Sequence, residues 1–119
     1  MANPNIVNVT TIYGGTAFLA VTTTTTAILS NAVASGTVVK VNSLYVSNVD
    51  GTNAVDINGT VYDGSTDWNI ASTISVPADT TLVLITKDTS IYLTEGQSIR
   101  LAASANSDLE AVISYEVIS

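Results

Sequence analysis

The feature that most constrains this chain is the alternation of apolar and polar residues in its C-terminal third. Along 108–118 the apolar set falls on every second residue, with charged or hydroxyl side chains such as Glu110 and Ser114 between its members. Successive side chains of a strand point to opposite faces, so a period of two predicts a β-strand with one buried face. The residues predicted to face inward are Leu109, Ala111, Ile113, Tyr115 and Val117.

The segment 97–104 has the same alternation, with Ile99, Leu101 and Ala103 predicted to point inward. A short polar connection, 105–108, separates it from the final strand. Short polar connections commonly join antiparallel neighbours, so the sequence predicts a hairpin between these two strands.

Turn-forming residues divide the rest of the chain into further candidate strands. In 53–62, Asn58-Gly59 is compatible with a hairpin turn, but we favour one continuous strand with a bulge or a close packing contact at Gly59, because a turn would leave very short arms. The segment 81–87 is apolar on both faces, which predicts a central or interface strand. The segment 27–34 fits either a strand or a short helical turn. The other candidates are 6–12, 16–25, 37–49, 66–76 and 91–93.

These segments amount to about eight strands with almost no helix. Two packed antiparallel sheets bury one face of each strand economically, so we predict an all-β fold, an antiparallel β-sandwich of jelly-roll or immunoglobulin-like type. The 119 residues favour a single domain, 1–119, in which 1–5 could form an extended arm onto a neighbour.

Composition excludes several classes of function. The formal net charge is −7 and the three cations, Lys40, Lys87 and Arg100, are scattered, so we expect no nucleic-acid partner. An anionic bilayer would repel this chain and no apolar run reaches the ~20 residues of a membrane span, so we expect no membrane partner. Cysteine and histidine are absent, which removes thiolate and imidazole chemistry, and we expect no enzyme and no cofactor. The N-terminus has no secretory signal, so synthesis in a host cytoplasm is expected.

The loop 63–67 holds the densest group of polar residues. Asp63 and Asp67 could contribute oxygens to a Ca²⁺ ion, but the loop lacks the ligand spacing of an EF-hand. Asp, Gly and Ser are also ordinary turn residues, and a plain turn is the favoured interpretation. Glu110 and Glu116 lie about 20 Å apart along one strand, too far for a catalytic pair, and we assign them to the solvated or partner-facing side of an outer strand.

Aromatic residues divide into two groups by their position in the alternation. Trp68 and Tyr115 fall on apolar rows and are predicted to lie in the core. Tyr62 and Tyr92 fall on the opposite rows, so we take them as candidate interface residues. Asn5, in the possible N-terminal arm, is a third interface candidate.

Three stretches carry a resemblance to a known family: SLYVSNVDGTNAVDINGTVYDGS, ISVPADTTLVLITKDTSIYL and YLTEGQSIRLAASANSDLEAVISYEVIS. The chain resembles small structural proteins of tailed phages, especially phages of marine cyanobacteria, that decorate or cement capsids. The resemblance implies a virion component on the capsid surface with the major capsid protein as partner. The family pattern includes no catalytic residue, so the resemblance implies none in this chain. Asp is common in the family where this chain has Gln97. We interpret this position as part of a turn and expect the change not to alter function.

Two functions follow as hypotheses. The first is a capsid decoration (cement) protein that stabilises the mature shell; the apolar strands 37–49 and 81–87 predict self-association, and the resemblance implies a homotrimer. The second is a structural or receptor-binding module of a tail fibre or neck that recognises a glycan.

Overall fold

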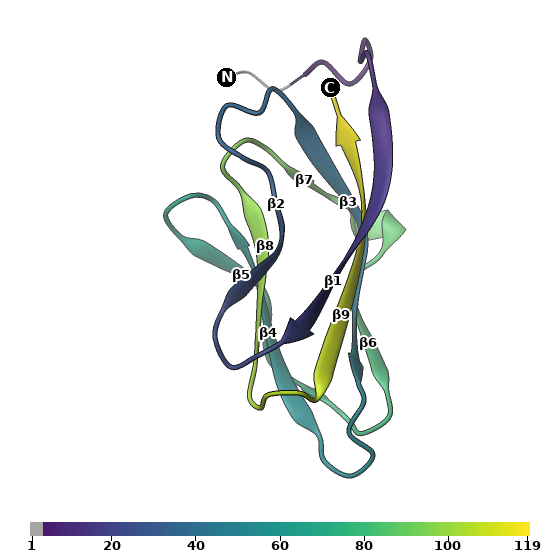
Figure 1. The fold of residues 1–119 in the computed structure, drawn as a ribbon, viewed down its shortest axis with the longest axis vertical. Coiled ribbons are helices and arrows are strands. Elements are labelled where there is room, and N and C mark those ends of the chain that lie inside the picture. The colour runs from purple at the N-terminus through teal and green to yellow at the C-terminus, as the bar shows by residue number, and fades with distance from the viewer. Residues whose placement is uncertain (1–3) are drawn as a thin grey trace.

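The computed structural model describes residues 4–119, which fold into two packed β-sheets (Figure 1). The five-stranded sheet 1 has the order β1-β9-β3-β6, with β7 also paired to β3, and the four-stranded sheet 2 has the order β2-β8-β4-β5. The strands are β1 (Ile12–Val21), β2 (Thr26–Ser30), β3 (Val38–Asn48), β4 (Val55–Tyr62), β5 (Asp67–Val76), β6 (Thr81–Ile85), β7 (Ile91–Leu93), β8 (Ser98–Ala103) and β9 (Leu109–Ile118), and a short 3₁₀ turn, η1 (Lys87–Thr89), separates β6 from β7. The predicted antiparallel sandwich is confirmed.

The pairing of the strands is nested, which distinguishes a jelly roll from an immunoglobulin-like sandwich. The first strand pairs with the last, β2 with β8, β3 with both β6 and β7, and β4 with β5, all antiparallel. Because β6 and β7 occupy one position beside β3, the nine strands fill the eight positions of a rolled-up hairpin. This is the arrangement of a jelly roll.

The core lies between the sheets and is built from the alternating apolar residues. Leu44 and Ile113 of sheet 1 and Ile57 and Leu101 of sheet 2 are completely buried. The inward faces predicted for β8 and for the first half of β9 are confirmed. Tyr115 is half-buried and packs against this core, beside Gly15 of β1.

Asn58 and Gly59 lie inside one continuous strand, as favoured from the sequence. β4 has register shifts around Gly59, where a Cβ atom would lie 3.3 Å from Leu101 Cδ2 and 3.4 Å from Ile70 Cγ1. Gly59 therefore marks both a bulge and a close contact between strands. The ambiguous segment 27–34 begins as strand β2 and ends in a turn, and Gly14-Gly15 lies within the single strand β1.

Several expectations about neighbouring strands were wrong. β8 and β9 do not form a hairpin, because the connection between them crosses from sheet 2 to sheet 1. β6, predicted to be a central or interface strand, is not central: it is an edge strand whose outer face is exposed at Val83, and its role as an interface strand stays a prediction. β9, predicted to be an outer strand, lies between β1 and β3, although Glu110 and Glu116 do lie on the outer face of its sheet.

Two buried asparagines tie loops to strands at the ends of the sandwich. The side-chain amide of Asn48 donates to the carbonyl oxygens of Asn53 and Val76, each at 2.9 Å, and its Oδ1 accepts from the backbone N–H of Asp50 at 2.9 Å. Asn31 Nδ2 donates to the carbonyl oxygens of Thr37 and Leu93 at 2.9 and 3.0 Å. Both residues satisfy buried backbone groups at points where the chain changes sheets.

The N-terminal segment precedes β1 at the end of the sandwich that also holds the C-terminus (Figure 1). Part of the predicted arm, 1–3, lies outside the described residues. Pro4 and Ile6 line a hollow with Val38, Tyr92 and Thr94. Among residues 4–119 no helix is long and apolar enough to cross a membrane.

Candidate functional site

A row of large apolar side chains crosses the outer face of sheet 1. In the strand register Phe18 of β1 lies opposite Val112 of β9, Val112 opposite Tyr45 of β3, and Tyr45 opposite Val83 of β6. Directly opposite residues on one face of a sheet have neighbouring side chains. We call these four residues, which span the whole width of this part of sheet 1, the apolar row.

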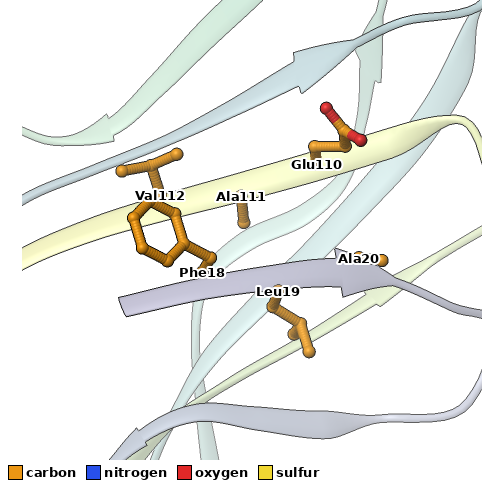
Figure 2. A pocket seen from close by; sticks show the side chains of 6 residues that line it. All are labelled: Phe18, Leu19, Ala20, Glu110, Ala111 and Val112. Atoms are coloured by element: carbon orange, nitrogen blue, oxygen red, sulfur yellow. The ribbon is translucent and has the colours of Figure 1, made fainter. Parts of the chain in front are cut away.

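The apolar row is open to solvent. Phe18 is 74% exposed, Val83 51% and Tyr45 37%, and Val112 is half-buried between its neighbours. Figure 2 shows Phe18 beside Val112, with Leu19 pointing away from them. Single exposed apolar residues are ordinary, but four that adjoin across a sheet form a patch of the kind that marks a contact with another molecule.

The positions on either side of the apolar row are mostly small and neutral. On the side toward the end of β1 they are Ala20, Glu110, Ser47 and Thr81, of which only Glu110 is charged; on the other side they are Thr16, Ser114 and Ser43. Ser47 Oγ and Thr81 Oγ1 are 2.9 Å apart and bond to each other. An apolar centre with a neutral polar rim is the pattern of a protein–protein interface.

The two aspartates that were considered as calcium ligands are held by donors of the protein. Asp63 Oδ1 accepts from the backbone N–H groups of Ser65 and Thr66 at 2.9 and 2.8 Å, and its Oδ2 accepts from Trp68 Nε1 at 2.8 Å. Asp67 accepts from Thr60 Oγ1 at 2.9 Å and lies 3.4 Å from Arg100 Nη1. Asp63 therefore organises the turn between β4 and β5. In residues 4–119 no three acidic side chains are grouped in a way that could hold a metal ion.

These hydrogen bonds stabilise the ionised form of Asp63. The indole N–H of Trp68, followed by the backbone N–H groups of Thr66 and Ser65, holds the pKa of Asp63 well below its ordinary value of 3.8. The carboxylate is therefore charged at neutral pH, and its role is to fix the hairpin tip and the indole ring.

Trp68 is the aromatic residue whose prediction was wrong. It pairs with Val61 and so lies on the inner face of sheet 2, but it is 61% exposed. The tip of the β4–β5 hairpin projects away from sheet 1 (Figure 1). The opposite sheet therefore does not cover Trp68, in agreement with its exposure. The sequence shows which face a residue occupies but not how far the other sheet extends.

The three candidate interface residues do not form one site, since Tyr62 and Tyr92 lie on different sheets and Asn5 lies in the segment before β1. Tyr62 is half-buried on sheet 2; its hydroxyl donates to the carbonyl oxygen of Gly64 at 3.0 Å, and the Arg100 guanidinium stacks 4.5 Å from its ring centroid. Tyr92 is on the same face of sheet 1 as the apolar row, opposite Lys40, and is 44% exposed. Asn5 is exposed, and its Oδ1 accepts from the backbone N–H of Val7 at 3.0 Å.

Sequence reasoning missed the apolar row. Phe18 and Val83 lie in segments that the sequence predicted to be strands. The sequence of these segments does not indicate which other strands pair with them. The available signal was the excess of apolar residues in 37–49 and 81–87, which predicted an interface without placing it. The row becomes visible only when the register of β1, β9, β3 and β6 is known.

No protein-family model and no curated protein matches this chain. Similar solved structures include two crystal structures of a pentameric capsid protein isolated from metagenomic phage sequences, one of them solved by iodide phasing. Each is 19% identical over 85% of this chain, with TM-scores of 0.41 and 0.40. The chain spans 59% and 63% of their lengths. A likeness of this size does not establish a shared function.

Proposed function

We propose that this protein is a capsid decoration (cement) protein of a phage, which binds the outer capsid lattice and stabilises the mature shell. The observation that carries the proposal is the apolar row, a solvent-exposed band that crosses sheet 1 with a largely uncharged rim. Its proposed occupant is the major capsid protein. Under this proposal the protein is made in the host cytoplasm and ends on the capsid surface.

Two further observations support the proposal. The family resemblance of three long stretches of the sequence implies a virion protein of this type. The fold is a jelly roll, an architecture that occurs among viral capsid and lectin domains, although this is support by analogy of fold alone. The proposal includes self-association; the trimer itself remains an expectation of the resemblance.

The energetics of the apolar row suit a protein that acts in many copies. Burying one large apolar side chain contributes roughly 1.5–3 kcal/mol, so the apolar row offers several kcal/mol, whereas association alone costs an estimated 4–15 kcal/mol. One isolated contact of this kind is weak. A ligand that binds only the assembled lattice still stabilises it by mass action, and the effect grows with the number of occupied sites.

The test is binding of the purified protein to expanded, decoration-free capsids of the phage that encodes it, measured by co-sedimentation. Phe18→Ser should weaken binding by at least about tenfold, since the buried ring contributes more than 1.4 kcal/mol. Val33→Ser is the matched control, because Val33 is as exposed as Phe18 but lies in the loop after β2. Absence of wild-type binding, or equal loss in both variants, would contradict the proposal.

One observation favours the second candidate, a glycan-binding module of a tail fibre or neck. The Trp68 ring is exposed and is oriented by Asp63, and flat aromatic faces of this kind can stack on sugar rings. Copy number separates the two functions: hundreds of copies in each virion indicate decoration, whereas tens or fewer indicate a tail or neck. Under the second function Trp68→Ala abolishes attachment to host cells and leaves the thermal stability of the shell unchanged.

A further inference from the structure

The edge of sheet 1 formed by β1 is open along its length. Within residues 4–119, β1 pairs with β9 and with no other strand, through ten consecutive residue pairs without a register shift. An edge strand presents unpaired N–H and C=O groups that can bind another strand. Natural proteins protect long edges with charged residues, proline, bulges or short strands. β1 has ten residues, IYGGTAFLAV, and has none of these protections.

The other free edges of the sandwich are protected. β5, also ten residues long, begins with Asp67, has register shifts against β4 and contains Thr73 at φ 51°. β2 and β6 have five residues each, and both have a register shift against their neighbour. β7, which pairs only with β3, has three residues. The lack of protection is therefore specific to β1 among the edges that the structure describes.

The backbone hydrogen bonds show which residues of β1 face the free edge. Thr11 and Ser119 exchange both backbone hydrogen bonds, at 2.9 and 3.0 Å, immediately before the first pair of β1 and β9. Such pairs alternate along an antiparallel ladder, so the odd-numbered residues from Thr11 onward bond to β9. The N–H and C=O groups that point to the free edge belong to Ile12, Gly14, Thr16, Phe18 and Ala20. All five residues lie on the outer face of sheet 1, the face that carries the apolar row.

The distribution of charged residues among the strands favours a second copy of the chain as the partner that binds at this edge. Two copies that each carry a net charge of −7 repel each other, but β1 itself is uncharged. The other strands of at least ten residues, β3, β5 and β9, each contain a charged residue. A second copy brings an identical uncharged strand. Two antiparallel β1 strands related by a two-fold axis perpendicular to the sheet keep their outer faces on the same side, because cross-strand neighbours share a face.

We propose that β1 pairs antiparallel with β1 of a second copy, which joins the two five-stranded sheets into one continuous sheet. The pairing also places the two apolar rows, each of which ends at Phe18 on β1, on the same face of the joined sheet, so that a dimer presents both rows to a partner. This pairing rests on the self-association that is part of the proposed function, and it specifies which strands would make the contact. A two-fold contact of this kind alone makes dimers and not trimers.

Single cysteines test the pairing directly, because the chain has no cysteine of its own. The variants Gly14→Cys, Thr16→Cys and Phe18→Cys place the thiol on the outer face of β1, and at Gly14 an added Cβ meets no atom within 4 Å. These residues would form hydrogen-bonded pairs across the new contact, whose Cα atoms lie about 5.5 Å apart, within the reach of a disulfide. Under mild oxidation, cross-linking should peak at the position on the two-fold axis or, where the axis passes between two of the positions, in the mixed sample of the two variants that flank it. The control Asn69→Cys, on the β5 edge, should remain uncross-linked.

A proline variant tests the same contact without oxidation. Thr16→Pro removes an N–H that points to the free edge, which edge strands tolerate, and should leave the fold intact by circular dichroism. Light scattering should give twice 12.3 kDa, about 24.6 kDa, for the wild type and for the control Thr16→Val, and 12.3 kDa for Thr16→Pro.

Three results would overturn the pairing: a wild-type monomer at 100 µM, a dimer that persists in Thr16→Pro, or no cross-link in any single or mixed sample of the three β1 cysteine variants. A wild-type trimer whose cross-links join unlike positions would overturn the two-fold pairing and support the family resemblance instead. All of these measurements use purified protein, so they are independent of capsid binding. If the dimer forms and does not bind capsids, the proposed function fails while this inference stands.

Discussion

Replacement of Asn48 by alanine tests how the jelly roll is held together where β3 ends. Asn48 is buried, and its amide group makes three hydrogen bonds to backbone groups, of Asn53, Val76 and Asp50. These join the end of β3 to the loop before β4 and to the end of β5, so one side chain connects sheet 1 to sheet 2. Alanine removes all three bonds and leaves the partner groups of the backbone without the amide.

The expected loss of stability follows from those three bonds. A buried hydrogen bond contributes about 1 kcal/mol net, and leaving a buried partner unsatisfied raises the cost, so we expect Asn48→Ala to lower the free energy of unfolding by roughly 2–4 kcal/mol. A domain of this kind has about 5–15 kcal/mol in total. Asn48→Asp should be at least as harmful, because a carboxylate would face the two carbonyl oxygens that now accept hydrogen bonds.

Urea denaturation, followed by circular dichroism at one fixed protein concentration, measures the effect. With an m-value of about 2 kcal/mol/M, the midpoint should fall by roughly 1–2 M while m stays unchanged. Asn69→Ala, on the exposed face of β5, is the matched control and should change stability by less than about 0.5 kcal/mol. Equal midpoints for the Asn48 and Asn69 variants would refute the bracing role of Asn48.

Two other predictions concern close packing and pH. Gly15→Ala should destabilise by about 1–3 kcal/mol, since its Cβ would lie 2.7 Å from Tyr115 Cζ; Gly14→Ala is the control, and equal melting temperatures would contradict the contact. Asp63→Asn should lower the melting temperature at pH 7. The pKa of Asp63 is depressed on folding, so its contribution is present above 3.8 and is lost as the pH falls further below that value. The difference between wild type and variant should therefore narrow in acid; a pH-independent difference would contradict this assignment.

Local alternation in the sequence predicted the fold class and much of the core. Ile99, Leu101 and Ile113 are buried because one face of each strand meets the opposite sheet, and the period of two is sufficient to show that face. Gly59 was also interpretable, because its lack of a side chain inside an apolar strand indicates a bulge or a close approach.

The pairing of strands was not predictable in the same way. A rolled hairpin puts most successive strands in opposite sheets, so the short connection between β8 and β9 looks like a hairpin turn and is a crossing instead. Trp68 lies on the inner face, as the alternation indicates, but its exposure depends on the extent of sheet 1. The apolar row has the same origin: its four residues come from four strands that are distant in sequence, and their adjacency follows from the register alone.

Cryo-electron microscopy of the intact phage particle tests the central claim most directly, namely that the outer face of sheet 1 is a contact surface on the capsid. The account predicts density for this jelly roll over the outer shell, with Phe18, Tyr45 and Val83 against the major capsid protein. Density for the chain in the tail or neck, or on the shell with these three side chains facing solvent, would contradict it.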